Sequence, residues 1–333
     1  MKGVLHLLKK LLALIIIIVI VDQLFGLCFT PIFFKQVRGK FFTTSYALKT
    51  TKDDILVIGA SHAAQHFDAK LMESKMGVSV FNLGNQKQSM LYYYPLIKSI
   101  LLRHKPKVII LTLEPDELQY STSDYDVLSI FLPYCGSNSY IDSAITLSDK
   151  TAKFKCLSNL YRYNSTLGYV FLYLIDKSYN KSIYSLGFDP QYGNNCKRSN
   201  ASNFTQAHAA KSKPGGVEAI HFKTSVDANK KIVSHFDSLK IKYLVNIISE
   251  LKQKNIKLLV VTTPLYEIHN SIYADSLSRL LTSKKVAFIN RTNDKTYSQN
   301  CDLFYDANHL NIKGADMFTN MIVDSLKSKT FIK

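Results

Sequence analysis

One serine stands at a predicted strand-to-helix corner, in the segment ILVIGASHAAQHFD (residues 55–68). Four apolar residues in succession predict a buried strand, Gly59 ends it, and a helical pattern begins at about Ser61. The free N–H groups at the start of a helix favour negative charge. Ser61 is therefore suited to attack a carbonyl whose oxygen becomes negative. The alternative is that Ser61 caps the helix, which is a common use of serine at this position.

An aspartate and a histidine near the other end of the chain could complete that chemistry. Asp306 and His309 lie three residues apart in FYDANHLNIKGADMF, just before a helix predicted from near Lys313. A serine nucleophile needs an imidazole to take its proton and a carboxylate to orient the imidazole, and one short loop can supply both. Two other histidines, His62 and His66, are spaced like metal ligands on a helix, but no HExxH pattern is present. We interpret these two as surface or supporting residues.

The elements that must position these residues follow an alternating strand and helix pattern. Such alternation predicts a three-layer α/β fold with a doubly wound, five-stranded parallel sheet, which binds ligands beyond the carboxyl ends of its strands. Ser61, Gly84, Asp116 and Pro264 each follow a predicted strand, and the loop with Asp306 and His309 follows the fifth. The predicted strands are 55–59, 78–82, 108–113, 257–263 and 286–290, and the predicted helices are 66–76, 90–102, 239–254 and 273–284.

These blocks resemble those of the SGNH (GDSL-like) hydrolase family. GASH (residues 59–62) is similar to the family's first block, with alanine in place of the usual aspartate, and FNLGNQ (residues 81–86) is similar to the second, with Gly84 as its glycine. Asp306 and His309 match the C-terminal DxxH block. In the third block, Asp116 falls where the family has asparagine. The resemblance implies a flavodoxin-like SGNH fold over roughly residues 53–327.

The resemblance also implies roles for these residues. Ser61 would be the nucleophile, His309 its base and Asp306 the group that orients the imidazole, with no metal or organic cofactor. The oxyanion hole would consist of the N–H groups of Ser61 and Gly84, with Asp116 at the position of the third donor. An ionised carboxylate repels an oxyanion, so Asp116 points away, is protonated, or is displaced by one position in the alignment. Losing one oxyanion donor costs about 3 kcal/mol, which still permits an active enzyme.

The N-terminus predicts a membrane anchor. Residues 11–29 are apolar apart from Asp22 and Gln23, and a helix needs about 20 such residues to cross a bilayer. No A-x-A cleavage site is visible, so an uncleaved anchor is favoured over a signal peptide. Three basic residues flank each side of this segment, so the positive-inside count is a tie. The short N-terminal tail favours a single pass through a bacterial cytoplasmic membrane with the catalytic domain outside. We expect an anchor (1–34), a juxtamembrane stalk (35–52) and one hydrolase-like domain (53–333).

An insertion at about residues 124–237 interrupts the repeat between the third and fourth strands. It is rich in tyrosine and polar residues, with one predicted helix over 164–175. A long loop of this kind is usually a lid, a binding surface or a mobile segment, and its tyrosines could stack on sugar rings or simply pack.

Composition fits one anchored domain with a polyanionic partner. The net charge of +17 is spread along the chain, and no nucleic-acid motif accompanies it, so anionic envelope polymers or lipid headgroups fit better than nucleic acid. The five cysteines (28, 135, 156, 196 and 301) show no CxxC spacing, which argues against zinc, and disulfides among the last four are possible in an oxidising compartment.

The sequence therefore predicts a membrane-anchored serine esterase or O-acyltransferase. The resemblance implies that it would act on acyl, chiefly acetyl, groups of an acylated carbohydrate or envelope polymer, with a membrane acyltransferase as a candidate partner. The D-alanine-transfer proteins of teichoic acid share this layout. Two alternatives remain open. One is an inactive protein of the same fold that binds a glycan or an acyltransferase, and the other is a tethered binding protein that uses its basic surface.

Overall fold

A five-stranded parallel sheet forms the centre of the molecule in the computed structural model, which describes residues 2–175, 186–194 and 235–328. The strands are β1 (Ile55–Ile58), β2 (Val80–Asn82), β3 (Val108–Thr112), β4 (Lys257–Thr262) and β5 (Ala287–Asn290). Their order is β2-β1-β3-β4-β5 and every pair is parallel. The predicted strands, and the doubly wound fold that the resemblance implies, are confirmed.

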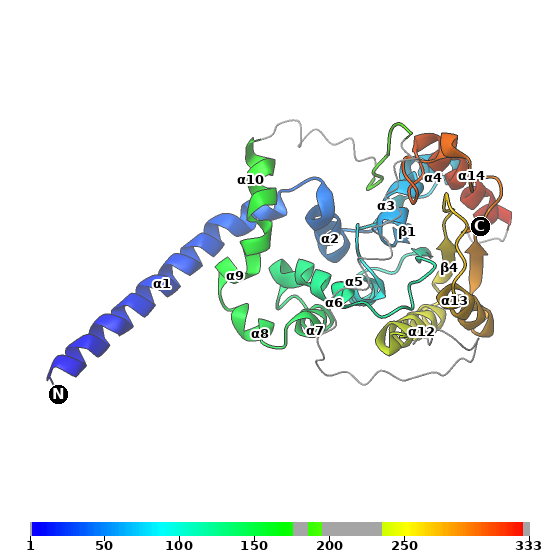
Figure 1. Ribbon diagram of the computed structural model, residues 1–333. Helices are drawn as coiled ribbons and strands as arrows, with labels where there is room; N and C mark the ends of the chain where they lie inside the picture. The colour runs from blue at the N-terminus through cyan, green and yellow to red at the C-terminus, as the bar shows by residue number, and fades with distance from the viewer. Residues whose placement is uncertain (1, 176–185, 195–234, 329–333) are drawn as a thin grey trace.

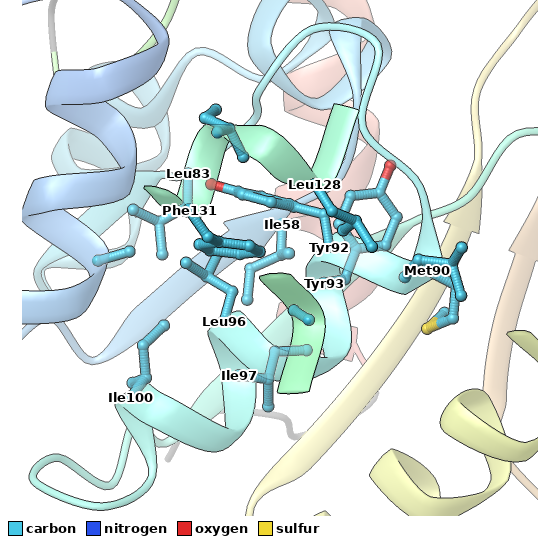
Figure 2. Packing of buried hydrophobic residues seen from close by; sticks show 14 of the residues in the cluster. Ile58, Leu83, Met90, Tyr92, Tyr93, Leu96, Ile97, Ile100, Leu128 and Phe131 are labelled. Atoms are coloured by element: carbon cyan, nitrogen blue, oxygen red, sulfur yellow. The ribbon is translucent and has the colours of Figure 1, made fainter. Parts of the chain in front are cut away.

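Helices cover both faces of the sheet, so the fold has three layers (Figure 1). One face packs against α2 (Gly39–Lys49), α5 (Met90–Ile100), α12 (Ser238–Gln253) and α13 (Ile272–Ser283). The other packs against α3 (Ser61–His66), α4 (Ala69–Met76) and α14 (Ile312–Ser328). Because side chains alternate along a strand, Leu56 and Ile58 enter the first core while Ile55 and Val57 enter the second. Figure 2 shows Ile58 in the first core beside Leu96 and Phe131.

The helix expected over residues 66–76 is divided into two. α3 ends at His66, and Asp68 starts α4 by accepting a hydrogen bond from the N–H of Leu71. Asp68 is a favourable N-cap residue, and Gly77 ends α4 in a left-handed conformation. The remaining predicted helices are present with shifts of one or two residues.

The segment expected to be a stalk, residues 35–52, instead belongs to the domain. Its residues 39–49 form α2, whose Phe41, Thr44 and Ala47 are buried. Thr44 Oγ1 lies 2.9 Å from the hydroxyl of Tyr92 on α5. The spacing of these small and aromatic residues is helical, but the lysines at both ends conceal it in the sequence.

The insertion contains more helix than predicted. Within residues 122–175 the chain forms a series of short helices, of which η1 and α7 pack on α5 through side chains such as Phe131 and Ile141. These helices are α6 (Thr122–Asp126), η1 (Val127–Tyr134), α7 (Ser139–Ser148), α8 (Ala152–Lys155), α9 (Asn159–Tyr163), η2 (Asn164–Thr166) and α10 (Leu167–Ile175). Most of the remaining insertion, residues 176–185 and 195–234, lies outside the described residues.

A single long helix, α1 (Lys2–Phe34), precedes the domain and projects from one edge of it (Figure 1). It is long and apolar enough to cross a membrane, and most of it is exposed. Its contacts with the domain begin at Asp22, and near its end Phe33 is buried against Phe41 and Tyr134.

Candidate active site

Ser61, His309 and Asp306 are brought together at the carboxyl end of the sheet, although Ser61 and His309 are 248 positions apart in the chain. Ser61 Oγ lies 2.9 Å from His309 Nε2. His309 Nδ1 lies 2.9 Å from each carboxylate oxygen of Asp306. One imidazole therefore contacts the hydroxyl with one nitrogen and the carboxylate with the other. This is the arrangement that allows a serine hydroxyl to be deprotonated as it attacks.

The alternative role of Ser61 as a helix cap is not realised. The N-cap position of α3 is Ala60, which has no side-chain oxygen, and Ser61 is the first helical residue. Gly59, two positions before Ser61, lies where β1, β3 and α3 meet. A Cβ at Gly59 would stand 2.7 Å from the carbonyl oxygen of Thr112, too close for any other residue. The glycine thus lets α3 start directly against the sheet and holds Ser61 at its edge.

The loop that carries His309 is fixed from two sides. Asp306 Oδ1 accepts the backbone N–H groups of Asn308 and His309, at 2.9 and 2.8 Å, so the carboxylate folds the loop as well as contacting the ring. On the other side, the N–H of Leu310 donates to Nε2 of His66 over 3.0 Å. His66 is fully buried in α3, so the helix that presents the serine also holds the histidine loop.

Gly84 lies against α3, as its block in the sequence suggested, but its N–H already has an acceptor. A Cβ on Gly84 would come within 2.1 Å of the backbone nitrogen of Ala64, so this close contact requires glycine. The N–H of Gly84 donates to Asn82 Oδ1 over 2.9 Å. Asn82 also donates to the carbonyl oxygens of Ala63 and Phe67, so this buried side chain joins β2 to α3. Gly84 therefore acts here as a packing contact for α3, and its N–H is engaged by Asn82.

Asp116 does not fit the oxyanion position proposed for it. A carboxylate accepts hydrogen bonds and cannot donate one to an oxyanion unless protonated. Its oxygens contact the hydroxyl of Ser271, at the start of α13, and His269 Nε2 at 3.1 Å. The hydrogen bond to Asp116 raises the pKa of His269, although burial opposes the rise. Asp116 is thus part of an ion pair with the segment before α13.

Comparison with models of known protein families shows which family the chain belongs to. A family model described as a protein of unknown function, DUF1574, matches residues 4–326. The chain belongs to the DUF1574 family. A search of curated proteins gives no match to it. Two solved structures are similar to this DUF1574 chain at 9% sequence identity each.

One of the two comes from Desulfitobacterium hafniense and is assigned to the G-D-S-L lipolytic family. It has a TM-score of 0.39 and covers 81% of this chain and 97% of its own. The other, from Bacteroides fragilis, is assigned as an acylhydrolase, with a TM-score of 0.40 and coverage of 87% and 95%. At this low similarity, only the geometry of its own site indicates which chemistry this DUF1574 protein can perform.

The hydrogen-bonded series Ser61–His309–Asp306 is called the relay below. A second carboxylate, Glu114, lies close to it in this DUF1574 chain. Glu114 Oε2 is 3.0 Å from His62 Nδ1, which is also 3.0 Å from the hydroxyl of Thr263. Burial raises the pKa of Glu114 to about 7, and nearby His309 only partly offsets the rise. Glu114 therefore exchanges a proton near neutral pH. Its charge interacts with His309.

The three histidines of the site have different environments. Burial lowers the pKa of His62 to about 3, with a further contribution from His309, and burial lowers that of His66 well below its usual value. Both rings are therefore neutral and stack on one another, with centroids 4.8 Å apart. For Asp306, burial raises the pKa, but the hydrogen bonds from His309 and the neighbouring N–H groups outweigh it and lower the pKa overall. Asp306 is thus held as the anion that the relay requires.

Two supporting residues, Glu114 and Asn82, were not assigned these roles from the sequence. Glu114 stands two positions before Asp116, and Asn82 was predicted only as the end of a strand. His66 was interpreted as a surface or supporting residue, and its contact with the N–H of Leu310 is a supporting one. The i, i+4 spacing of His62 and His66 was a usable signal, but it indicated packing of the two rings and a contact from His66 to the loop of His309, not metal binding.

No metal centre is built from the part of the chain that the structure describes, where no three His, Cys, Asp or Glu residues cluster suitably. Cys135 and Cys156 are free thiols, so they do not form one of the disulfides considered from the sequence. Burial and the neighbouring Cys135 raise the pKa of Cys156 to about 12, which makes this thiol a poor nucleophile.

Proposed function

We propose that this protein is a membrane-anchored serine esterase or O-acyltransferase that works through an acyl-serine intermediate. The observation that carries the proposal is the hydrogen-bonded relay from Ser61 Oγ through His309 to Asp306, with both steps at 2.9 Å. Its support is geometric, because the relay is assembled without a substrate and Asp306 also accepts the N–H groups of its own loop.

In the proposed reaction, Ser61 Oγ attacks the carbonyl carbon of an ester while His309 Nε2 takes the hydroxyl proton. The carbonyl oxygen becomes an oxyanion, which the N–H of Ser61 at the start of α3 is positioned to stabilise. The tetrahedral intermediate collapses, the C–O bond of the leaving alcohol breaks, and His309 returns the proton to that alcohol. The acyl group remains on Ser61 and then passes to water or to another hydroxyl by the same steps in reverse order.

The oxyanion hole requires a second donor, and Gly84 is a candidate only if Asn82 releases its N–H. In this structure that N–H donates to Asn82 Oδ1. We propose that substrate binding turns the peptide or displaces the amide oxygen. Without that step the oxyanion has one fewer donor, which lowers the rate by about 100- to 1,000-fold.

The proposed substrates are acyl groups, acetyl foremost, on a cell-envelope or exported polysaccharide. Two features support this assignment. The net charge of +17 favours anionic polymers, and α1 would hold the domain at the outer face of a bacterial cytoplasmic membrane. In this proposal an integral membrane acyltransferase is the partner that supplies or receives the acyl group.

A fluorophosphonate probe tests the proposal, because it reacts covalently with activated serines only. We expect the full-length protein in detergent to be labelled, and Ser61→Ala to abolish labelling. The matched control is Ser74→Ala, which removes an exposed serine hydroxyl on the neighbouring helix α4. It should be labelled like the wild type. Mass spectrometry of the Ser61 peptide after incubation with an acetyl ester would then detect the acyl-serine.

The second candidate is an inactive protein of the same fold that binds a glycan or an acyltransferase. The engaged N–H of Gly84 and the carboxylate of Asp116 favour it, since both remove expected oxyanion donors. Absence of labelling in a correctly folded protein would support this candidate over the enzyme.

A further inference from the structure

The anchor helix α1 is fixed to the domain at a point inside its apolar segment. Asp22 is 7% exposed and accepts three hydrogen bonds from the start of α9. These come from the Ser158 hydroxyl at 2.7 Å and from the N–H groups of Asn159 and Leu160 at 2.8 and 2.9 Å. The carboxylate thus satisfies N–H groups that a helix start leaves free, where negative charge is favoured.

Further contacts along α1 make this attachment rigid. Gly26 leaves room for Asn159, whose side chain would stand 2.3 Å from a Cβ at that position. One to two turns on, the Thr30 hydroxyl donates to the Tyr163 hydroxyl over 3.0 Å, and the ring of Phe29 lies 5.2 Å from that of Tyr163. Helix α9 therefore keeps a fixed position along the anchor.

The length of the free part of α1 sets where α9 lies relative to a bilayer. Residues 2–21 are exposed on all sides, and the contacts with the domain begin at Asp22. At 1.5 Å per residue these positions span about 30 Å, which is the thickness of the hydrocarbon core. If the core instead begins after Lys10, the helix reaches Asp22 after only about 18 Å, and α9 lies deeper. In either case α9 is at the lipid boundary or below it.

The helices beside this attachment expose large apolar side chains. Figure 1 shows α8, α9 and α10 along the edge of the domain from which α1 leaves. In α10 only Val170 is buried. Apolar surface of this extent is unusual in a soluble domain. The exposed side chains, named here the apolar edge, include Phe154, Leu157, Leu160, Phe171, Leu174 and Ile175, with Leu157 79% and Phe171 61% exposed.

Basic residues accompany the apolar edge. Lys150 and Lys153 are exposed in the segment KTAKFK, around Phe154, and Lys155 beside them is exposed but paired with Asp149 at 2.6 Å. Lysines beside exposed aromatic and leucine side chains are typical of surfaces that enter the headgroup region of an anionic membrane.

We infer that the apolar edge is a second membrane-binding surface, which inserts into the leaflet next to Asp22 and seats the domain on the bilayer. The inference rests on the anchor role of α1 and is independent of the serine chemistry. The occupant is lipid, because the edge continues the apolar surface of α1 at the depth where that helix leaves the hydrocarbon core. Phe154, Leu157 and Phe171 enter the lipid, and the lysines bind anionic headgroups.

Tryptophan fluorescence tests this directly, since the chain contains no tryptophan. Leu157→Trp and Phe171→Trp place one fluorophore each on the apolar edge of the full-length protein. Ile17→Trp, in the free part of α1, is the positive control, and Met317→Trp, exposed on α14 away from α1, is the negative control. Each variant is reconstituted into phosphatidylcholine–phosphatidylglycerol vesicles with brominated or ordinary acyl chains. Bromine quenches tryptophan only on contact.

We expect brominated chains to lower the emission of both edge variants and of Ile17→Trp by about twofold or more, with Met317→Trp nearly unchanged. Edge variants that behave like Met317→Trp would overturn the inference, as would quenching at only one of the two edge positions. A blue-shifted emission without quenching would also overturn it, because a protein partner or a second copy would then cover the edge. An unquenched Ile17→Trp would also overturn the inference, because α1 would then not lie in the bilayer. Labelling of Ser61 by a fluorophosphonate is unaffected by any of these results.

Discussion

Replacing Asp306 by asparagine separates the orienting role of the carboxylate from its role in folding the loop. The amide oxygen of Asp306→Asn can still accept the N–H groups of Asn308 and His309, which Oδ1 now accepts at 2.9 and 2.8 Å. The amide NH₂, however, would face His309 Nδ1 in place of a carboxylate oxygen now at 2.9 Å. An NH₂ group donates, so Nδ1 must become the acceptor and the proton moves to Nε2. The ring can then no longer take the proton of Ser61.

The size of the effect follows from the exposure of the carboxylate. In a fully buried relay this substitution lowers kcat about 10⁴-fold. Here the Asp306 side chain is 39% exposed, and water can compensate part of the loss. We therefore expect kcat/KM for a chromogenic acetyl ester to fall by about 10³-fold, or about 4 kcal/mol, with the unfolding temperature nearly unchanged.

The assay compares Asp306→Asn with Asp302→Asn, which changes an exposed carboxylate on the same loop region. Asp302→Asn should keep wild-type activity. If folded Asp306→Asn keeps activity within about threefold of the wild type, the assignment of the relay is refuted.

Three further predictions concern the residues around the relay. Gly84→Ala should destabilise the protein by about 1–3 kcal/mol and reduce fluorophosphonate labelling, because its Cβ would meet the backbone of α3 at 2.1 Å. Gly168→Ala, with open space around it, should be neutral or slightly stabilising in the same thermal unfolding assay. His66→Phe should cost about 1–3 kcal/mol in denaturant unfolding and lower kcat, since it leaves the buried N–H of Leu310 unpaired; equal stability and rate would contradict the role of His66. For Glu114, burial raises the pKa from 4.5 to about 7, so the folded state holds a proton that the unfolded state loses as pH rises through this window. Wild-type stability therefore falls relative to Glu114→Gln between about pH 5 and about pH 8, and a constant difference would exclude the shift.

The sheet could be predicted from the sequence because β1, β2 and β3 are buried along their whole length. Residues 108–111 of β3 are an uninterrupted apolar run, and such runs are visible without an alignment. The pairing of Ser61 with His309 could also be predicted. Both residues follow the carboxyl ends of strands, and a parallel sheet places all those ends on one edge. Local pattern and topology therefore agree at the relay.

Other parts of the site depend on contacts that a sequence pattern does not contain. The hydrogen bond from Gly84 to Asn82 depends on the direction of one peptide group, which no residue type specifies. The stalk expected over residues 35–52 contains helix α2, because Phe41 packs against Phe33 and Tyr169 and Thr44 meets Tyr92 on α5, tertiary contacts hidden by the flanking lysines. Asp22 seemed an interruption of the apolar segment, whereas it is the acceptor that α9 needs.

The attachment of Asp22 to α9 leaves no hinge between the long N-terminal helix and the sheet. Only residues 35–38 separate α1 from α2, and α2 is itself built into the core. If α1 spans a membrane, Ser61 stays at a constant height above the lipid and cannot swing toward distant material. Under the proposed function, the acyl groups within its reach are then those that neighbouring molecules bring to that height, so the geometry of the tether would select substrates before any pocket does.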